Sequence, residues 1–191
     1  MKQILCFGDS NTYGLIPGTT NQRYGWGTRW TSILDDKVRT KGLCGRTTVF
    51  DDPFRTERRG TEMLPAILES HRPVDTIVLM LGTNDCKSVY SATPEVIGQG
   101  IEQLLDQINT VNPDAKILLV SPIYLGNSIR ILSKYHGICP GCMRKSPEEE
   151  IFLIFRLQNL PDREKPIRSI WMNWDIADLQ MQFMKSLQDE A

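Results

Sequence analysis

The sequence has very few histidines and no long apolar run. Its 191 residues include only two histidines, His71 and His136. No uninterrupted apolar stretch reaches the ~18 residues that a membrane-spanning helix needs. The first expected strand begins within a few residues of Met1, so we expect no signal peptide. Together these absences predict a cytoplasmic protein without a membrane partner.

The sequence also has no excess of charge of either sign. Its 22 Lys and Arg residues nearly balance its 23 Asp and Glu residues, which gives a formal net charge of −1. A chain with this balance is not drawn to nucleic acid or to anionic membranes by charge, so we expect neither as a partner. With 40% hydrophobic residues and no repeats or linkers, residues 1–191 are expected to form a single domain with one core.

The cysteines do not form a regular framework. Five of them, an odd number, are scattered along the chain as Cys6, Cys44, Cys86, Cys139 and Cys142. This pattern favours reduced thiols over a set of disulfides. Cys139-Pro-Gly-Cys142 has the spacing of a redox pair, but neither a strand before it nor a helix after it is evident. Because the chain has no second pair at such spacing, we expect no metal site.

Apolar runs alternate with amphipathic segments along the first two thirds of the chain. Continuous apolar runs predict buried strands, and apolar residues at helical spacing predict helices. The expected strands are residues 4–7, 76–81 and 116–120, and the expected helices are residues 28–39, 61–71 and 93–111. Residues 41–53 are expected to be a loop, because they contain two glycines and end in Asp-Asp-Pro. This alternation indicates an α/β fold with a parallel sheet.

Two polar turns follow the first two expected strands. Residues 8–11 are Gly-Asp-Ser-Asn, and residues 82–85 are Gly-Thr-Asn-Asp. Ligands of parallel α/β sheets bind beyond the carboxyl ends of the strands, which is where both turns lie. Taken alone, each sequence is more typical of a plain turn. Their occurrence together after two buried strands favours a functional site.

Ser10 is the candidate nucleophile of such a site. A serine hydroxyl attacks an ester efficiently only when a base takes its proton, and the oxyanion that forms needs preorganised N–H donors. The candidate donors are the backbone N–H groups of Ser10 and Gly45 and the side-chain amide of Asn84. The neighbouring charged residues are expected to be local structural partners rather than catalytic groups: Asp9, Arg46 and Asp85.

The segments 8–11, 42–48 and 82–85 resemble the first three blocks of the SGNH, or GDSL, hydrolases. Residues 46–48 with 51–53, and residues 79–81, resemble the arylesterase/acyltransferase branch of that family more closely. This resemblance implies a flavodoxin-like three-layer α/β/α sandwich with a parallel sheet. It implies a serine ester hydrolase that acts on small acyl esters through an acyl-Ser10 intermediate, without metal or cofactor. Gly45 and Asn84 would complete the oxyanion hole. Some relatives in that branch form oligomers, so a homo-oligomer is an alternative to a monomer.

The fourth block of that family, Asp-x-x-His near the C-terminus, is absent from this chain. In the family its histidine is the base, and its aspartate orients that histidine. His71 is expected at the opposite end of the sheet from Ser10, and His136 has Ser133 rather than an acid three residues before it. The catalytic His and Asp are therefore not identifiable, which predicts impaired catalysis. The resemblance covers about residues 1–125, whereas about residues 130–191 are atypical.

We hypothesise that the C-terminal part is read in a shifted frame. Residues 171–175 are Trp-Met-Asn-Trp-Asp, and Trp and Met have single codons. Read from the third base of each preceding codon, this DNA encodes Leu or Met, then Asp-Glu-Leu-Gly, then His or Tyr. In the same frame, codons 166–167 permit Asp and codons 169–170 permit His, which restores Asp-x-x-His. The shift would lie between about residues 122 and 134, and the Asp requires G as the third base of codon 166.

Two alternatives stay open at this point. The first is a catalytically inactive remnant of the SGNH fold, which the missing Asp-x-x-His block favours. The second is a flavodoxin-like binding module or a thiol oxidoreductase that uses Cys139 and Cys142. The second leaves the joint presence of Ser10, Gly45 and Asn84 without an explanation.

Overall fold

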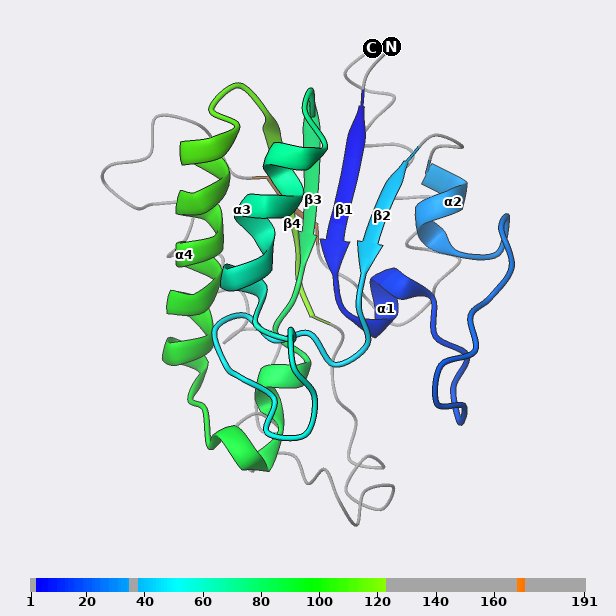
Figure 1. Cartoon of the computed structure of the whole chain (residues 1–191), viewed down its shortest axis with the longest axis vertical. Helices are drawn as coiled ribbons and strands as arrows, with labels where there is room; N and C mark the ends of the chain where they lie inside the picture. The colour runs from blue at the N-terminus through cyan, green and yellow to red at the C-terminus, as the bar shows by residue number, and fades with distance from the viewer. Residues whose placement is uncertain (1–2, 35–37, 123–167, 171–191) are drawn as a thin grey trace.

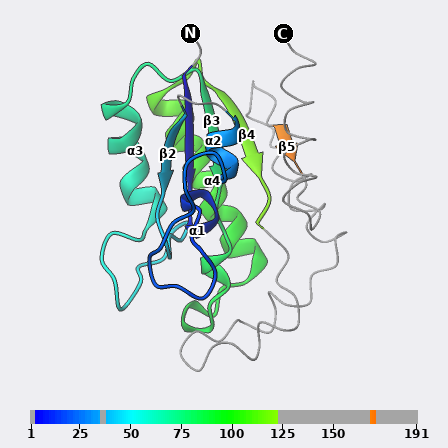
Figure 2. The same cartoon turned by 90° about the vertical axis from the view of Figure 1, so that its right-hand side faces the viewer.

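The computed structural model describes residues 3–34, 38–122 and 168–170. Its centre is a parallel sheet of β1 (Ile4–Gly8), β2 (Arg39–Gly42), β3 (Thr76–Met80), β4 (Lys116–Val120) and β5 (Arg168–Ile170). The strands lie in the order β2-β1-β3-β4-β5 (Figure 1), which is the flavodoxin-like order. Figure 2 shows β5 beside β4, at the edge of the sheet opposite β2. The predicted α/β fold with a flavodoxin-like parallel sheet is confirmed.

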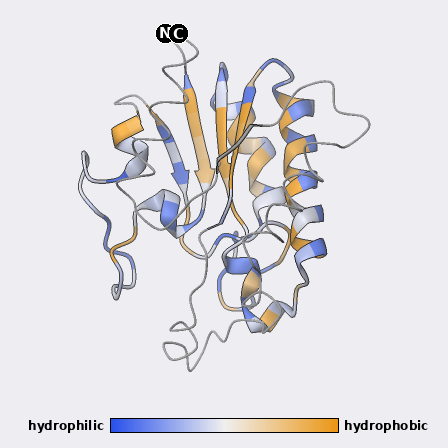
Figure 3. Ribbon diagram, turned by 180° about the vertical axis from the view of Figure 1, so that it is seen from behind, coloured by the Kyte–Doolittle hydropathy of each residue, from blue (hydrophilic) through white to orange (hydrophobic). Residues whose placement is uncertain are grey.

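The side chains of the central strands are buried on both faces of the sheet. Along β1, Leu5 and Phe7 belong to one core cluster, whereas Cys6 between them belongs to the other. Residues alternate in this way because successive side chains of a strand point to opposite faces. Burial on both faces explains why β1, β3 and β4 are continuous apolar runs in the sequence (Figure 3).

Helices cover both faces of the sheet and so form the outer layers. The helices α3 (Gly60–Ser70) and α4 (Pro94–Val111) bury Leu64, Leu68 and Leu104 in the first cluster. The short helix α2 (Trp30–Leu34) packs its two terminal residues against the second cluster. Figure 1 shows α3 and α4 on one side of the sheet and α2 on the other. This arrangement gives the three layers of the predicted sandwich.

The helix α4 begins as the sequence predicts. The Thr93 hydroxyl accepts a hydrogen bond from the Val96 N–H at 3.5 Å, and Pro94 occupies the first turn. A threonine cap satisfies one N–H of the first turn, and proline has no N–H to leave unpaired there. None of the described helices is long and apolar enough to cross a membrane.

The prediction for residues 28–53 is wrong in one respect. The expected helix 28–39 is limited to α2, residues 35–37 lie outside the described part, and Arg39–Gly42 form β2 instead of helix and loop. The sequence Arg-Thr-Lys-Gly has no apolar pattern, and β2 is largely hydrophilic in Figure 3. This strand lies at the sheet edge and is held by backbone pairing with β1, which residue patterns do not reveal.

Candidate active site

The strand order places a ligand site at the carboxyl ends of β1 and β3. The connection from β1 leads to β2 on one side of it, whereas the connection from β3 leads to β4 on the other side. In open parallel sheets the crevice at such a reversal of strand order is where ligands bind. Ser10 is the first residue of α1 (Ser10–Tyr13), separated from β1 only by Asp9, and Asn84 opens the short helix η1 (Asn84–Cys86) after β3. Both candidate residues therefore lie at this end of the sheet.

Asp9 is a buried carboxylate that caps the turn carrying Ser10. Its carboxylate accepts the Asn11 N–H at 2.9 Å and so caps α1. Its other carboxylate oxygen is buried and has no hydrogen-bond partner among the described residues. Asp9 is 1% exposed, and burial raises its pKa to about 6, although the contact with Asn11, the nearby Thr83 side chain and the Arg46 charge act in the opposite direction. Asp9 thus braces the turn that carries Ser10.

Arg46 joins the segment 42–48 to the turn after β1. One of its N–H groups donates to the Gly8 carbonyl at 2.9 Å and to the Lys41 carbonyl, and its guanidinium lies 4.1 Å from the ring centroid of Phe7. Burial lowers the Arg46 pKa to about 10, and Asp9 partly offsets that effect. Arg46 is therefore a buried brace, as expected from the sequence.

Two further hydrogen-bonded contacts join the same segment to the turn after β3. The Asn84 side-chain amide donates to the Arg46 carbonyl at 3.0 Å. The Asp85 carboxylate accepts the Thr48 N–H at 2.9 Å and the Thr48 hydroxyl at 2.5 Å. Asp85 is fully buried, and burial raises its pKa to about 6. The three segments singled out in the sequence are thus held together by hydrogen bonds between residues next to the candidate site residues.

Each candidate oxyanion donor keeps an N–H group without a protein acceptor among the described residues. The contact with the Arg46 carbonyl uses one N–H of the Asn84 amide, and an amide has two. Among the described residues, neither the Gly45 N–H nor the Ser10 N–H has a protein acceptor. Gly45 has a φ of +86°, in the left-handed region that glycine adopts without strain. These three N–H groups are therefore retained as the candidate oxyanion donors.

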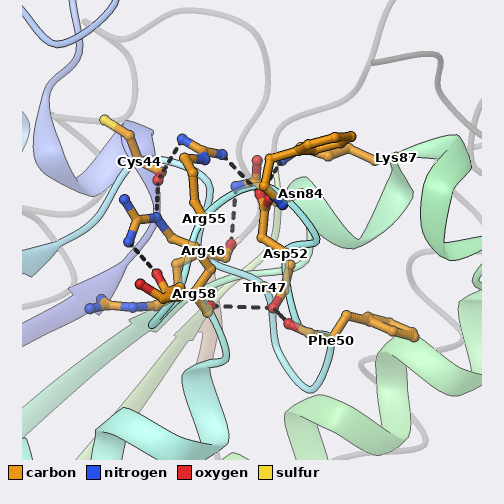
Figure 4. Close-up of polar contacts among 11 residues, drawn as sticks. Cys44, Arg46, Thr47, Phe50, Asp52, Arg55, Arg58, Asn84 and Lys87 are labelled. Carbon is orange, nitrogen blue, oxygen red and sulfur yellow. Dashed lines mark hydrogen bonds and ion pairs between the residues drawn. The ribbon is translucent and has the colours of Figure 1, made fainter. Parts of the chain in front are cut away.

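Two arginines that the sequence analysis did not single out lie beside Gly45. The guanidinium groups of Arg55 and Arg58 both donate to the Cys44 carbonyl (Figure 4). Residues 55–59, Arg-Thr-Glu-Arg-Arg, contain three cations directly after the candidate site loop. This cluster was the one sequence signal that could have indicated Arg55 and Arg58. Their contact depends on how the loop folds back, which sequence patterns do not predict.

No base for Ser10 is found in the described part of the chain. His71 ends α3 and precedes β3, so the length of a five-residue strand, about 16 Å, separates it from the carboxyl end of the sheet. Its Nδ1 atom lies 2.8 Å from the Ile67 carbonyl oxygen. His136, Cys139 and Cys142 lie outside the described residues. Within the described residues no group of His, Cys, Asp and Glu side chains could hold a metal ion.

Comparison with known proteins identifies the family. The model of the GDSL-like Lipase/Acylhydrolase family matches residues 6–149, about three quarters of the chain. The chain belongs to this family. No curated protein matches the chain.

Several solved structures similar to this chain are named as esterases. The inhibitor-bound aryl esterase of M. smegmatis is 30% identical, with 90% of this chain and 84% of that chain covered and a TM-score of 0.75. Its native form is 27% identical, with 99% of each chain covered and a TM-score of 0.80. Est24, a carbohydrate acetylesterase from Sinorhizobium meliloti, is 28% identical, with 100% of this chain and 98% of that chain covered and a TM-score of 0.81. By this resemblance the chain is a carboxylic ester hydrolase of the SGNH type.

Proposed function

We propose that Ser10 is the nucleophile of this esterase and that it forms an acyl-serine intermediate. The observation that carries the proposal is the joining of three segments at the carboxyl ends of β1 and β3, with Ser10 two residues after the end of β1. In this proposal the N–H donors for a nucleophile at this position come from all three segments. Such donors stabilise the charge that develops when an ester carbonyl is attacked.

The proposed reaction has two steps of acyl transfer. In the first, the Ser10 oxygen bonds to the ester carbonyl carbon, and its proton leaves to a base. The carbonyl oxygen becomes an oxyanion bound by the N–H groups of Ser10, Gly45 and Asn84. Collapse of this intermediate expels the alcohol, which takes up a proton. Water, or another alcohol, then attacks the acyl group and regenerates the serine hydroxyl.

We propose that this chain is slow because Ser10 lacks its own base. His71 is at the wrong end of the sheet, and the chain contains no Asp-x-x-His sequence. A serine protease that has lost its triad keeps a rate about 10³–10⁴ above that in water, from the oxyanion hole and binding alone. We expect residual activity of this order, and the alternative is a fold that binds esters without turning them over.

The substrate that we propose is a small acyl ester, with acetyl as the simplest acyl group. The support is the naming of similar structures as an aryl esterase and a carbohydrate acetylesterase. Transfer of the acyl group to an alcohol other than water uses the same intermediate, so acyltransfer belongs to the same proposal.

The test is hydrolysis of p-nitrophenyl acetate by the full chain and by Ser10→Ala at matched concentrations. We expect a slow rate in the parent chain that is lost in the variant. Added imidazole supplies a base from solution, so it should accelerate the parent chain more than it accelerates Ser10→Ala. Equal rates for the two proteins, with and without imidazole, would exclude Ser10 as the nucleophile and leave the inactive fold as the answer.

A further inference from the structure

The peptide bond between Cys44 and Gly45 carries both a proposed oxyanion donor and an unusual acceptor. Its N–H is the Gly45 donor, and its carbonyl oxygen is that of Cys44. Arg58 Nε donates to this oxygen at 2.9 Å, and Arg55 Nη1 donates to it at 3.3 Å (Figure 4). Two cationic groups therefore contact the far end of the same planar unit that presents the Gly45 N–H.

Each arginine is held in this position by partners of its own. Arg55 donates to the Asp52 carboxylate at 3.1 Å, and Lys87 Nζ lies 3.6 Å from the same carboxylate oxygen. Arg58 also donates to the Thr56 carbonyl at 2.8 Å. Both guanidinium groups are thereby fixed before any ligand arrives, so their contact with Cys44 is part of the folded loop.

The backbone of the loop is also fixed where it returns to the site. The Thr47 N–H donates to the Arg58 carbonyl at 3.0 Å, and the Gly60 N–H donates to the Thr47 carbonyl at 3.0 Å. Glu57, directly before Arg58, has a φ of +62°, which is strained for a residue with a side chain. A strained residue persists only where surrounding contacts determine the conformation, and here it turns Arg58 back toward Cys44.

We propose that Arg55 and Arg58 are positioning residues that prepare the Gly45 N–H for the oxyanion. This inference rests on the proposed function of Gly45. The arginines act in two ways through the Cys44 carbonyl. They restrain rotation of a peptide that precedes a glycine and is otherwise free to turn. They also draw electron density toward the carbonyl oxygen, which makes the N–H of the same amide a stronger donor.

A purely structural role does not explain why two arginines contact this one carbonyl. The Cys44 residue is half-buried, and water can satisfy a single loop carbonyl at such a position. Two guanidinium groups, each with its own anchor, instead occupy the full acceptor capacity of that carbonyl oxygen. Preorganised donors give catalysis without reorganisation during the reaction, and a restrained Gly45 peptide meets that requirement.

The test compares Arg58→Ala and Arg55→Ala with Arg59→Ala as the matched control. Arg59 is the next arginine of the same loop, but its guanidinium pairs with Asp51 instead of Cys44. The first readout is the proton chemical shift of the Gly45 amide in the ¹⁵N-labelled full chain. The second is the Ser10-dependent rate with p-nitrophenyl acetate and imidazole, obtained by subtracting the rate of Ser10→Ala.

We expect Arg58→Ala to move the Gly45 amide proton upfield and to lower the Ser10-dependent kcat about tenfold, with KM unchanged, because one donor is weakened rather than removed. Arg55→Ala should do the same to a smaller degree, Arg58→Lys should recover most of the loss, and Arg59→Ala should change neither readout. If Arg58→Ala does not fold, Arg55→Ala carries the same two readouts.

The inference is overturned by an unmoved Gly45 amide in both Ala variants, or by a moved amide with unchanged kcat. An equal loss of kcat in Arg59→Ala would also overturn it. If the parent chain and Ser10→Ala react at the same rate, the proposed function fails instead. In that case the chemical shift of the Gly45 amide proton alone tests whether the arginines orient and polarise the Cys44–Gly45 peptide.

Discussion

The two buried carboxyl groups beneath the site predict that acid stabilises this fold. Burial raises the pKa values of Asp9 and Asp85 from 3.8 to about 6. Each folded carboxyl therefore binds its proton more tightly than the unfolded chain does. The stability that protonation contributes is complete below pH 3.8 and is lost as the pH rises through about 6. For one carboxyl, this rise in pKa corresponds to about 3 kcal/mol of free energy of unfolding. The contributions of the two carboxyls are not fully additive, because the charge of Asp9 also raises the pKa of Asp85.

The assay is urea unfolding of the full chain and of Asp85→Asn between about pH 7 and about pH 4. Asparagine keeps one oxygen for the Thr48 donors but does not titrate. The difference in free energy of unfolding between the two proteins cancels every group that they share. Asp52 has a lowered pKa, because the Phe54 N–H and the Arg55 guanidinium outweigh the effect of burial, so it titrates below this window.

We expect the parent chain to gain about 2–2.5 kcal/mol relative to Asp85→Asn as the pH falls across this window, with most of the gain between about pH 6 and about pH 4. Asp9→Asn should give a difference of the same sign. A difference that stays constant with pH, or that moves against the parent chain on acidification, would refute the assignment of these carboxyls as buried and desolvated.

Three further predictions concern the site and its origin. Asn84→Ala removes one oxyanion donor and should lower the Ser10-dependent kcat with p-nitrophenyl acetate about 10²-fold; an unchanged rate would exclude the amide from catalysis. Gly45→Ala should lower the free energy of unfolding by about 1–2 kcal/mol and should also lower that rate, because its φ is +86° and a Cβ there would overlap the Arg55 guanidinium. Gly18→Ala is the matched control in thermal melts and kinetics, since Gly18 has a φ of +79° with no atom within 4 Å of a Cβ, and it should lower stability only. Sequencing the coding DNA should find G as the third base of codon 166 and C as that of codon 169, and any other base at codon 166 would end the frame-shift hypothesis.

The parts of the fold that could be predicted from the sequence are those that burial dictates. Strands β1, β3 and β4 are apolar runs because both sheet faces are covered, and α4 carries its Thr93 cap and Pro94 in the first turn. Strand β2 was missed because Arg39–Gly42 form an edge strand through backbone pairing. A hydrogen bond between main chains leaves no pattern of side chains to read.

Part of the candidate site could be predicted from the sequence, and part of it could not. The turns after β1 and β3 could be placed together because parallel strands end at one edge of the sheet. The contact of Arg58 with Cys44 could not, since it depends on a loop that returns through Glu57 in a left-handed conformation. The roles of Ser10, Gly45 and Asn84 stay predictions, as do the cytoplasmic location and the oligomeric state.

The measurement that tests the central claim most directly is the location of the acetyl group after brief mixing with p-nitrophenyl acetate. Without a base, attack of water on the acyl-enzyme is slow, whereas p-nitrophenolate is a good leaving group that departs without taking up a proton. This chain should therefore accumulate the intermediate. We expect mass spectrometry of the digested full chain to find acetyl on Ser10, and none on that peptide from Ser10→Ala. Acetyl found only on other side chains, or release of p-nitrophenol that continues unchanged in Ser10→Ala, would contradict the account.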